Sequence, residues 1–162
     1  MNTIVGFSVA IVAGSVIGII TDEIIIGNKH KKKIRKLKES QSKLQEFYLI
    51  LLQWIRVKQE KKSLVDYFKR NGISTIAIYG MRELGEALIE ELRDTGIIVK
   101  YGIDKNADNI FAEVDMYTPE ESLEPVDAIV VTAVHYYDEI EQDLKEKTNA
   151  KIVSIEDVVW EA

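Results

Sequence analysis

The sequence predicts an α/β fold with a small parallel sheet, preceded by one N-terminal transmembrane helix and a helical stalk. Three observations lead to this prediction: an uncharged apolar segment near the N-terminus, apolar residues at helical spacing after it, and short apolar segments alternating with amphipathic ones in the rest of the chain. The chain then divides into an anchor (1–28), a basic juxtamembrane and coiled-coil stalk (29–61) and an α/β domain (62–162).

Charge follows the same division. Residues 1–28 carry a net charge of −2, residues 29–62 carry +9, and residues 63–162 carry −13. The acidic domain should repel nucleic acid, whose binding depends on neutralising phosphates. The chain has no cysteine and only two histidines, so disulfides and thiol catalysis are excluded and a histidine metal cluster is disfavoured.

The uncharged segment 3–20 would span about 27 Å as a helix, close to the thickness of a hydrocarbon core. A cleaved signal peptide has its positive charges before the apolar run, whereas here seven lysines and arginines follow it within residues 29–38. The positive-inside rule then predicts a single-pass protein of the cell membrane, with the N-terminus outside and the C-terminal domain in the cytoplasm.

Self-association into a homo-oligomer is expected through this anchor and the stalk that follows it. Gly6, Ala10, Gly14 and Gly18 recur every four residues, and small residues on one helix face let two membrane helices pack closely. The basic run after the anchor is expected to contact anionic lipid headgroups.

The stalk is predicted from apolar residues in steps of three and four, which form a heptad seam with one polar core position, Gln41. Residues 47–52 (FYLILL) are apolar on every side, so this part of the helix must be enclosed. We therefore expect a helix bundle, or a stalk folded against the following domain, more than a free two-stranded coil. A single amphipathic helix docked on its own domain stays open as the alternative. The seam consists of Ile34, Leu37, Gln41, Leu44, Tyr48, Leu51 and Ile55.

In the last domain, Ser63 is expected to cap a short helix that ends at Gly72. Apolar strands without polar alternation, separated by helices, indicate a parallel sheet covered on both faces. The expected fold is a small Rossmann-like sheet of order 3-2-1-4-5. Strands are expected at 74–79, 97–103, 114–117, 127–133 and 151–155, with helices at 83–94 and 137–147 and a last helical turn after Ser154.

Ligands of such folds bind beyond the carboxyl ends of the strands, where the strand order reverses. The turn after the first strand nearly matches the dinucleotide fingerprint G-x-G-x-x-G, with Arg82 in the middle glycine slot. Arg82 either crowds a pyrophosphate or grips it with its guanidinium. The candidate binding residues are Gly80, Arg82, Gly85, Asp104, Thr132 and His135.

Two of these residues have competing interpretations. Asp104 lies 24 residues after Gly80, which is where a dinucleotide-binding fold places an acidic residue that accepts hydrogen bonds from the ribose hydroxyls. The alternative is a solvated turn residue. His135 is either a ligand contact or a loop histidine. The sequence shows no second domain to hold a substrate, so we assign no catalytic or metal-binding residue and favour an enzyme least among the possible functions.

Residues 62–160 resemble a family of small bacterial Rossmann-like domains associated with surface-polysaccharide biosynthesis. The motifs that carry the resemblance are IAIYGMRELGEALIEEL, YGIDKNAD, YTPEE, VDAIVVTA and KIVSIEDV. They are similar to the N-terminal domains of membrane sugar-nucleotide epimerase/dehydratases and polyprenol-phosphate sugar transferases. The resemblance implies a ligand such as NAD(P) or a sugar nucleotide at Gly80, Gly85 and Asp104.

The expected function is therefore that of a membrane-anchored, self-associating accessory protein. Its cytoplasmic domain would bind a nucleotide-type ligand or a membrane-bound partner enzyme in cell-envelope polysaccharide biosynthesis. The alternatives are a ligand-free scaffold with a degenerate Rossmann-like domain and, ranked last, a sugar-nucleotide oxidoreductase or epimerase.

Overall fold

The structure is a computed structural model that describes the backbone of residues 2–162 and the side chains of residues 29–162. The predicted membrane anchor at residues 1–28, with its row of small residues, lies outside the part whose side chains are described. In that described part, from residue 29 onward, no helix has the length and apolar character needed to cross a membrane. The chain separates into two compact units, Met1–Glu46 and Phe47–Ala162.

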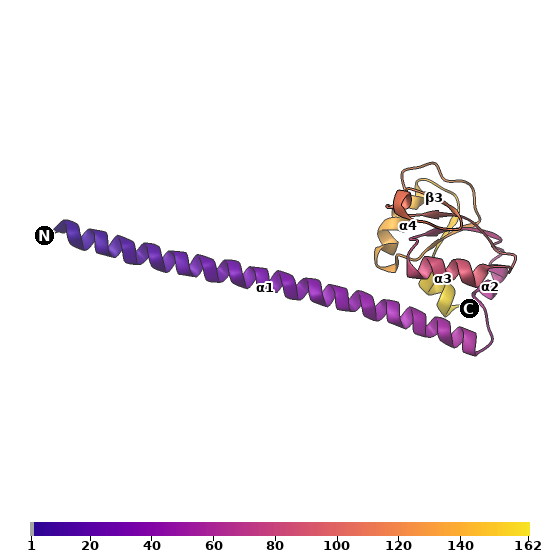
Figure 1. Ribbon diagram of the computed structural model, residues 1–162, viewed down its shortest axis with the longest axis horizontal. Coiled ribbons are helices and arrows are strands. Elements are labelled where there is room, and N and C mark those ends of the chain that lie inside the picture. Colours follow the sequence, from indigo (N-terminus) through magenta and orange to yellow (C-terminus); the bar gives the residue numbers. More distant parts are fainter. Residues whose placement is uncertain (1) are drawn as a thin grey trace. The chain divides into compact units, whose positions relative to one another are not determined.

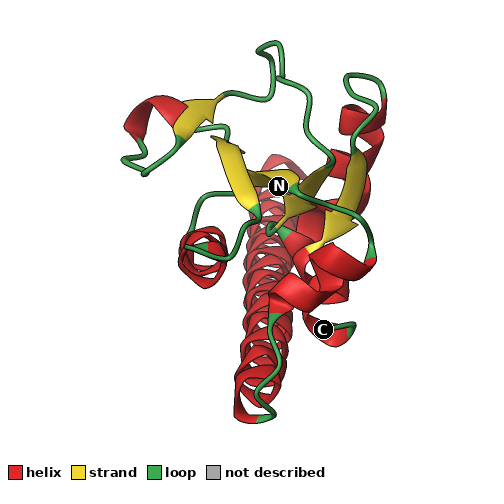
Figure 2. Cartoon of the chain, turned by 90° about the vertical axis from the view of Figure 1, so that its right-hand side faces the viewer, coloured by secondary structure: helices red, strands yellow, loops and turns green. Residues whose placement is uncertain are grey.

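The second unit contains a five-stranded parallel sheet of order β3-β2-β1-β4-β5 (Figures 1 and 2). This confirms the predicted Rossmann-like sheet and its strand order. The helices are α1 (Asn2–Gln59), α2 (Leu64–Arg70), α3 (Glu83–Leu92), α4 (Tyr137–Lys145) and α5 (Ile155–Trp160), with short 3-10 turns η1 (Ala107–Asn109) and η2 (Val134–Tyr136). The strands are β1 (Thr75–Tyr79), β2 (Ile98–Ile103), β3 (Asp115–Tyr117), β4 (Ala128–Val131) and β5 (Lys151–Ser154).

The central strands are apolar on both faces because each face has its own core. In β1, Ile76 and Ile78 belong to the core shared with α2, α3 and α5, whereas Ala77 and Tyr79 belong to the core shared with α4. Side chains of a strand alternate between the two faces, so a strand buried on both sides has no polar positions. This is the physical reason for the uninterrupted apolar runs in the sequence.

Serine side chains fix the beginnings of two helices. The hydroxyl of Ser63 accepts a hydrogen bond from the Val65 N–H, and Asp66 completes a capping box at the start of α2. Ser154 accepts a hydrogen bond from the Glu156 N–H at the start of α5. Each side chain pairs an N–H that the helix itself leaves unpaired. The predicted cap at Ser63 is confirmed.

The last turns of α1 are part of the domain. Ile50, Trp54 and Val57 are buried in the same core as α2 and α3, with exposed fractions of 7% or less. The Glu91 carboxylate on α3, itself 8% exposed, receives hydrogen bonds from the Lys58 ammonium at 2.7 Å and from the Ser63 hydroxyl at 3.2 Å. The apolar segment 47–52 is therefore docked on its own domain along one side, through Ile50 with Phe47 and Leu51. It is not enclosed on every side as the sequence predicted, because Tyr48 and Leu49 are 61% and 46% exposed.

Asp127 fastens the amino ends of β1 and β4 to each other. Its carboxylate accepts hydrogen bonds from the N–H groups of Ser74 and Thr75 at 2.9 and 2.8 Å, and from the Thr75 hydroxyl at 2.9 Å. These bonds, led by that of the Ser74 N–H, hold the pKa of Asp127 below its ordinary value of 3.8. Hydrogen bonds to the charged form favour it, so the ionised carboxylate is the one that stabilises the sheet.

Replacing Trp54 with alanine should lower the free energy of unfolding of the domain by about 3–5 kcal/mol, because it leaves a cavity where α1 meets the core. Urea unfolding of the fragment Phe47–Ala162 measures this change. The matched control is Arg56→Ala, an exposed position on the same helix, which should stay within about 0.5 kcal/mol of the wild type. Equal effects of the two substitutions would contradict the docking of α1.

Replacing Asp127 with asparagine should destabilise the domain near pH 7 and make little difference at low pH. The folded-state pKa is lowered, so the stabilisation is present above the ordinary value of 3.8 and is lost as the pH falls through the lowered pKa. Urea midpoints of both proteins across the acid range test this. The exposed Asp115→Asn in β3 serves as control, and a pH-independent difference at Asp127 would contradict the assignment.

Candidate functional site

The loop after β1 closes tightly against the loop after β4, at the position where the strand order reverses. Gly80 has a φ of +97°, and a Cβ there would lie 2.7 Å from the Thr132 hydroxyl and 3.3 Å from the Ala133 nitrogen. The Thr132 hydroxyl donates a hydrogen bond to the Gly80 carbonyl at 2.5 Å. Both the backbone conformation and the space therefore require glycine at position 80.

Helix α3 begins just as close to this loop. A Cβ on Gly85 would lie 2.5 Å from the carbonyl oxygen of Gly80, which is backbone and cannot swing aside. The third glycine of the fingerprint therefore serves the packing of helix on strand, a role that it has whether or not a ligand binds.

Asp104, at the end of β2, turns its carboxylate toward the same loop. One oxygen accepts a hydrogen bond from the Met81 N–H at 3.2 Å, and the other accepts one from the Asn106 N–H at 2.9 Å. The carboxylate thus joins the first loop to the turn after β2. The sequence allowed a ribose contact or a turn residue, and the structure gives Asp104 the bonds of a turn residue with one bond across to the glycine loop.

The structure therefore brings together four of the predicted site residues: Gly80, Gly85, Thr132 and Asp104. Arg82 and His135 take no part in these contacts. Arg82 is exposed and precedes the first residue of α3, and its side chain makes no capping hydrogen bond to the helix. His135 lies half-buried in η2, the turn that follows β4.

Met81 is a part of this region that the sequence analysis did not single out. Its side chain is 3% exposed, and its Cγ would lie 2.7 Å from a Cβ on Gly102 of β2. The residue between the first two fingerprint slots is thus a core residue that packs over β2. A methionine flanked by glycine and arginine gives no periodic signal, which is why the pattern alone did not reveal it.

The phenol of Tyr79, at the end of β1, is buried beside this loop. Burial raises the pKa of Tyr79 above 10.0, and the carboxylates of Asp143 and Asp104 add to the increase. A phenol in this state can donate a hydrogen bond near neutral pH but does not act as a base.

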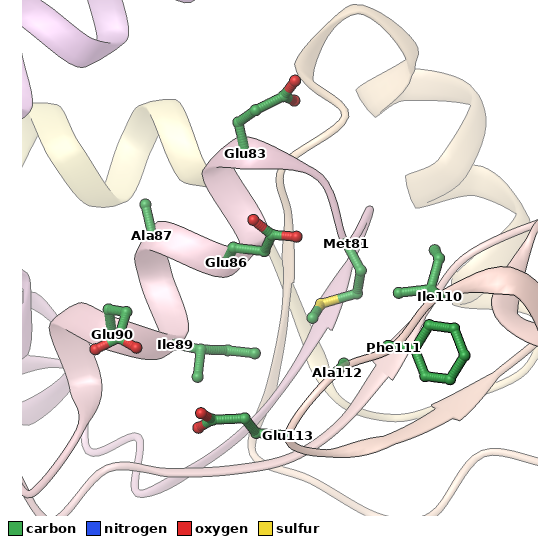
Figure 3. A pocket seen from close by; sticks show the side chains of 10 residues that line it. All are labelled: Met81, Glu83, Glu86, Ala87, Ile89, Glu90, Ile110, Phe111, Ala112 and Glu113. Carbon is green, nitrogen blue, oxygen red and sulfur yellow. The ribbon is translucent and has the colours of Figure 1, made fainter.

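A pocket of about 660 Å³ lies between α3 and the connection from β2 to β3 (Figure 3). In place of the crossover helix of a longer Rossmann unit, this connection has only the short turn η1 and an irregular segment. Phe111, in that segment, is completely exposed. The pocket is lined by Met81, Glu83, Glu86, Ala87, Ile89, Glu90, Ile110, Phe111, Ala112 and Glu113.

The electrostatics of this pocket disfavour an anionic ligand. Its lining contains four glutamates and no lysine or arginine, and Glu83, Glu86 and Glu90 share one face of α3 (Figure 3). At one side, the Arg93 guanidinium bridges Glu90 and Glu113 at 2.6 and 2.8 Å. Carboxylates repel phosphates, so the pocket is better matched to an apolar or cationic group.

Comparisons with protein-family models, curated proteins and solved structures gave no match to this chain. The structure establishes a Rossmann-like parallel α/β domain, and the resemblance to polysaccharide-biosynthesis domains stays a prediction. Within residues 29–162, no group of three or more histidine or carboxylate side chains is arranged to hold a metal ion.

Replacing Gly85 with alanine should destabilise the domain by about 1–3 kcal/mol, although alanine is the better helix former, because the new methyl group meets the Gly80 carbonyl. Thermal or urea unfolding measures the change. Glu86→Ala, an exposed position on the same turn of α3, should stay within about 0.5 kcal/mol. A stabilised Gly85→Ala variant would contradict the close approach of α3 to the loop.

Proposed function

We propose that this chain is a membrane-anchored accessory scaffold whose Rossmann-like domain acts through protein contacts and holds no nucleotide at the β1 loop. The observation that carries the proposal is the internal pairing of that loop. Two polar groups of this loop system already have partners: Asp104 receives the Met81 N–H, and the Gly80 carbonyl receives the Thr132 hydroxyl. A ligand would have to replace or share these bonds.

The exposed surface beside the loop supports protein contact instead. Phe111 is fully exposed above an acidic pocket, and an aromatic side chain surrounded by polar groups is typical of interaction surfaces. The net charge of −13 over residues 63–162 favours a partner with a basic surface.

The cellular setting of the proposal comes from the sequence. The anchor at residues 1–28 and the basic run after it support a place at the cytoplasmic side of the cell membrane, and the resemblance supports a role beside an enzyme of envelope polysaccharide biosynthesis. Anchoring both proteins to one membrane raises their effective concentration for each other, so a weak contact is enough for association.

One observation favours a second candidate, in which the domain binds a nucleotide or sugar nucleotide. Arg82 is exposed at the beginning of α3, and its side chain makes no capping bond. A guanidinium there could bind a phosphate through two parallel hydrogen bonds, next to the positive end of the helix dipole. An oxidoreductase or epimerase would need this binding as well as a proton-transfer residue, for which His135 is the remaining candidate.

A thermal-shift panel on the fragment Phe47–Ala162 with NAD(H), NADP(H), UDP-sugars and CDP-sugars separates the two candidates. The fragment begins at Phe47 because Ile50, Trp54 and Val57 belong to its core. A ligand at about 100 times its dissociation constant would add about 2.7 kcal/mol of stability. The scaffold proposal predicts no shift for any of these compounds.

The Arg82→Gly variant gives the panel its internal control. If the arginine obstructs a degenerate site, the variant gains a shift that the wild type lacks. If the wild type shifts and the variant loses that shift, Arg82 grips phosphate and the nucleotide-binding candidate replaces the scaffold. Turnover of a sugar nucleotide that disappears in His135→Ala would establish the enzyme.

A further inference from the structure

Helix α1 has a row of large apolar side chains that are exposed in the part of the chain whose side chains are described. Ile34, Leu37, Leu44, Tyr48 and Ile55 are all between 53% and 68% exposed. Single exposed apolar residues are common on protein surfaces, but a continuous row along one helix marks an interaction surface.

The row has the spacing of a coiled-coil seam. With Gln41 and Leu51, its members follow one another in steps of three and four over about three heptads, which places them at the a and d positions. In this register Ile34, Gln41, Tyr48 and Ile55 are a positions, and Leu37, Leu44 and Leu51 are d positions.

Docking of α1 onto the domain uses mainly a neighbouring face of the helix. Ile50, Trp54 and Val57, which are buried in the core, occupy c and g positions of the same heptads. Tyr48 and Ile55 alternate with them along the chain and stay more than half exposed. The docked face adjoins the seam, because Leu51 at a d position and Phe47 at a g position pack partly against the domain core. The other apolar members of the seam stay more than half exposed and are open to a partner.

We infer that a second copy of this chain covers the seam, in a parallel, in-register, two-stranded coiled coil. The seam is complementary to itself, since each apolar a or d side chain then packs at the level of its own counterpart. At the single polar position, each Gln41 amide can donate to and accept from the other, which fixes the register.

The residues that flank the seam between positions 40 and 54 permit this pairing. At the e and g positions between residues 40 and 54 stand Ser40, Gln45, Phe47, Leu52 and Trp54, none of which is charged. Like charges therefore do not face each other along this stretch. They do at the N-terminal end of the seam, where Lys33 at a g position and Lys38 at an e position oppose each other across a parallel pair. A parallel arrangement also keeps both N-terminal segments at the same end, as two anchors in one membrane require.

The inference deepens the proposed scaffold function, because it names a second copy of the chain as one protein that the scaffold binds. It rests on the proposed function only in calling this pairing part of a scaffold. It depends on α1 and not on the β1 loop. Nucleotide binding by the domain would therefore leave the seam unaffected, and a failed seam would leave the ligand panel unaffected.

Cysteine cross-linking of the full chain in its native cell fraction tests the pairing, because the chain has no cysteine of its own. Leu37→Cys and Leu44→Cys are introduced singly, oxidised, and run on a non-reducing gel, where a dimer has twice the 18.4 kDa mass of the chain. The control, Glu39→Cys, lies on the opposite face of α1. Both seam variants should cross-link at least about tenfold faster than the control, since cysteines whose Cα atoms are more than about 7 Å apart cannot be bridged.

Any other pattern of cross-linking among the three cysteine variants overturns the inference. Cross-linking of Leu44→Cys without Leu37→Cys would indicate an antiparallel pair centred near residue 44. Equal rates at all three positions would indicate random collision, and absence of cross-linking would exclude a second copy at the seam.

A second substitution separates the seam from association through the anchor. Adding Leu44→Glu to the Leu37→Cys chain should reduce cross-linking at least about tenfold, because a carboxylate cannot be buried unpaired in a coiled-coil core. Undiminished cross-linking would overturn the inference. The thermal unfolding of the domain should be unchanged, since Leu44 lies outside its core.

Discussion

Three segments of the chain meet at Gly80, and their close approach determines the geometry at the carboxyl end of the sheet. The carbonyl of Gly80 receives the Thr132 hydroxyl from the loop after β4, and the start of α3 comes so near that a Cβ on Gly85 would lie 2.5 Å from the same oxygen. Asp104 adds a bond from the end of β2 to the Met81 N–H. The loop after β1 is thus a junction between strands.

This junction connects the fold to the proposed function. A dinucleotide site needs backbone N–H groups and a carboxylate that are free to meet the ligand, together with a glycine that lets the backbone approach a pyrophosphate. Here the carboxylate is bonded within the loop system, an arginine stands in the glycine slot, and the adjacent pocket is lined by glutamates. The same topology can therefore support a domain that uses its outer surface instead of its crevice, as expected when function depends on sites and not on folds.

Much of this fold could be predicted from local sequence, because its signals are local. The uninterrupted apolar runs of β1 and β4 and the cap at Ser63 each identify an element, and the alternation of strands and helices restricts the sheet order. The end of α1 could not be assigned, since a helix bundle and a docked helix bury the same residues, Ile50 and Trp54. The partner of Asp104 depends on a contact with Met81, 23 positions away, which no spacing rule encodes. The pocket beside Phe111 could not be predicted, because its two walls come from separate segments of the chain. The wall formed by residues 110–113 has no periodic sequence pattern.

The edges of the sheet have a further consequence for how copies of this protein can meet. β3 is three residues long and begins with the exposed carboxylate of Asp115, while β5 is four residues long and begins with the exposed Lys151. Short outer strands with charged side chains make poor templates for strand addition. The sheet is thereby protected against edge-to-edge polymerisation. Domains of this kind can be crowded together at high local concentration without growing into fibrils.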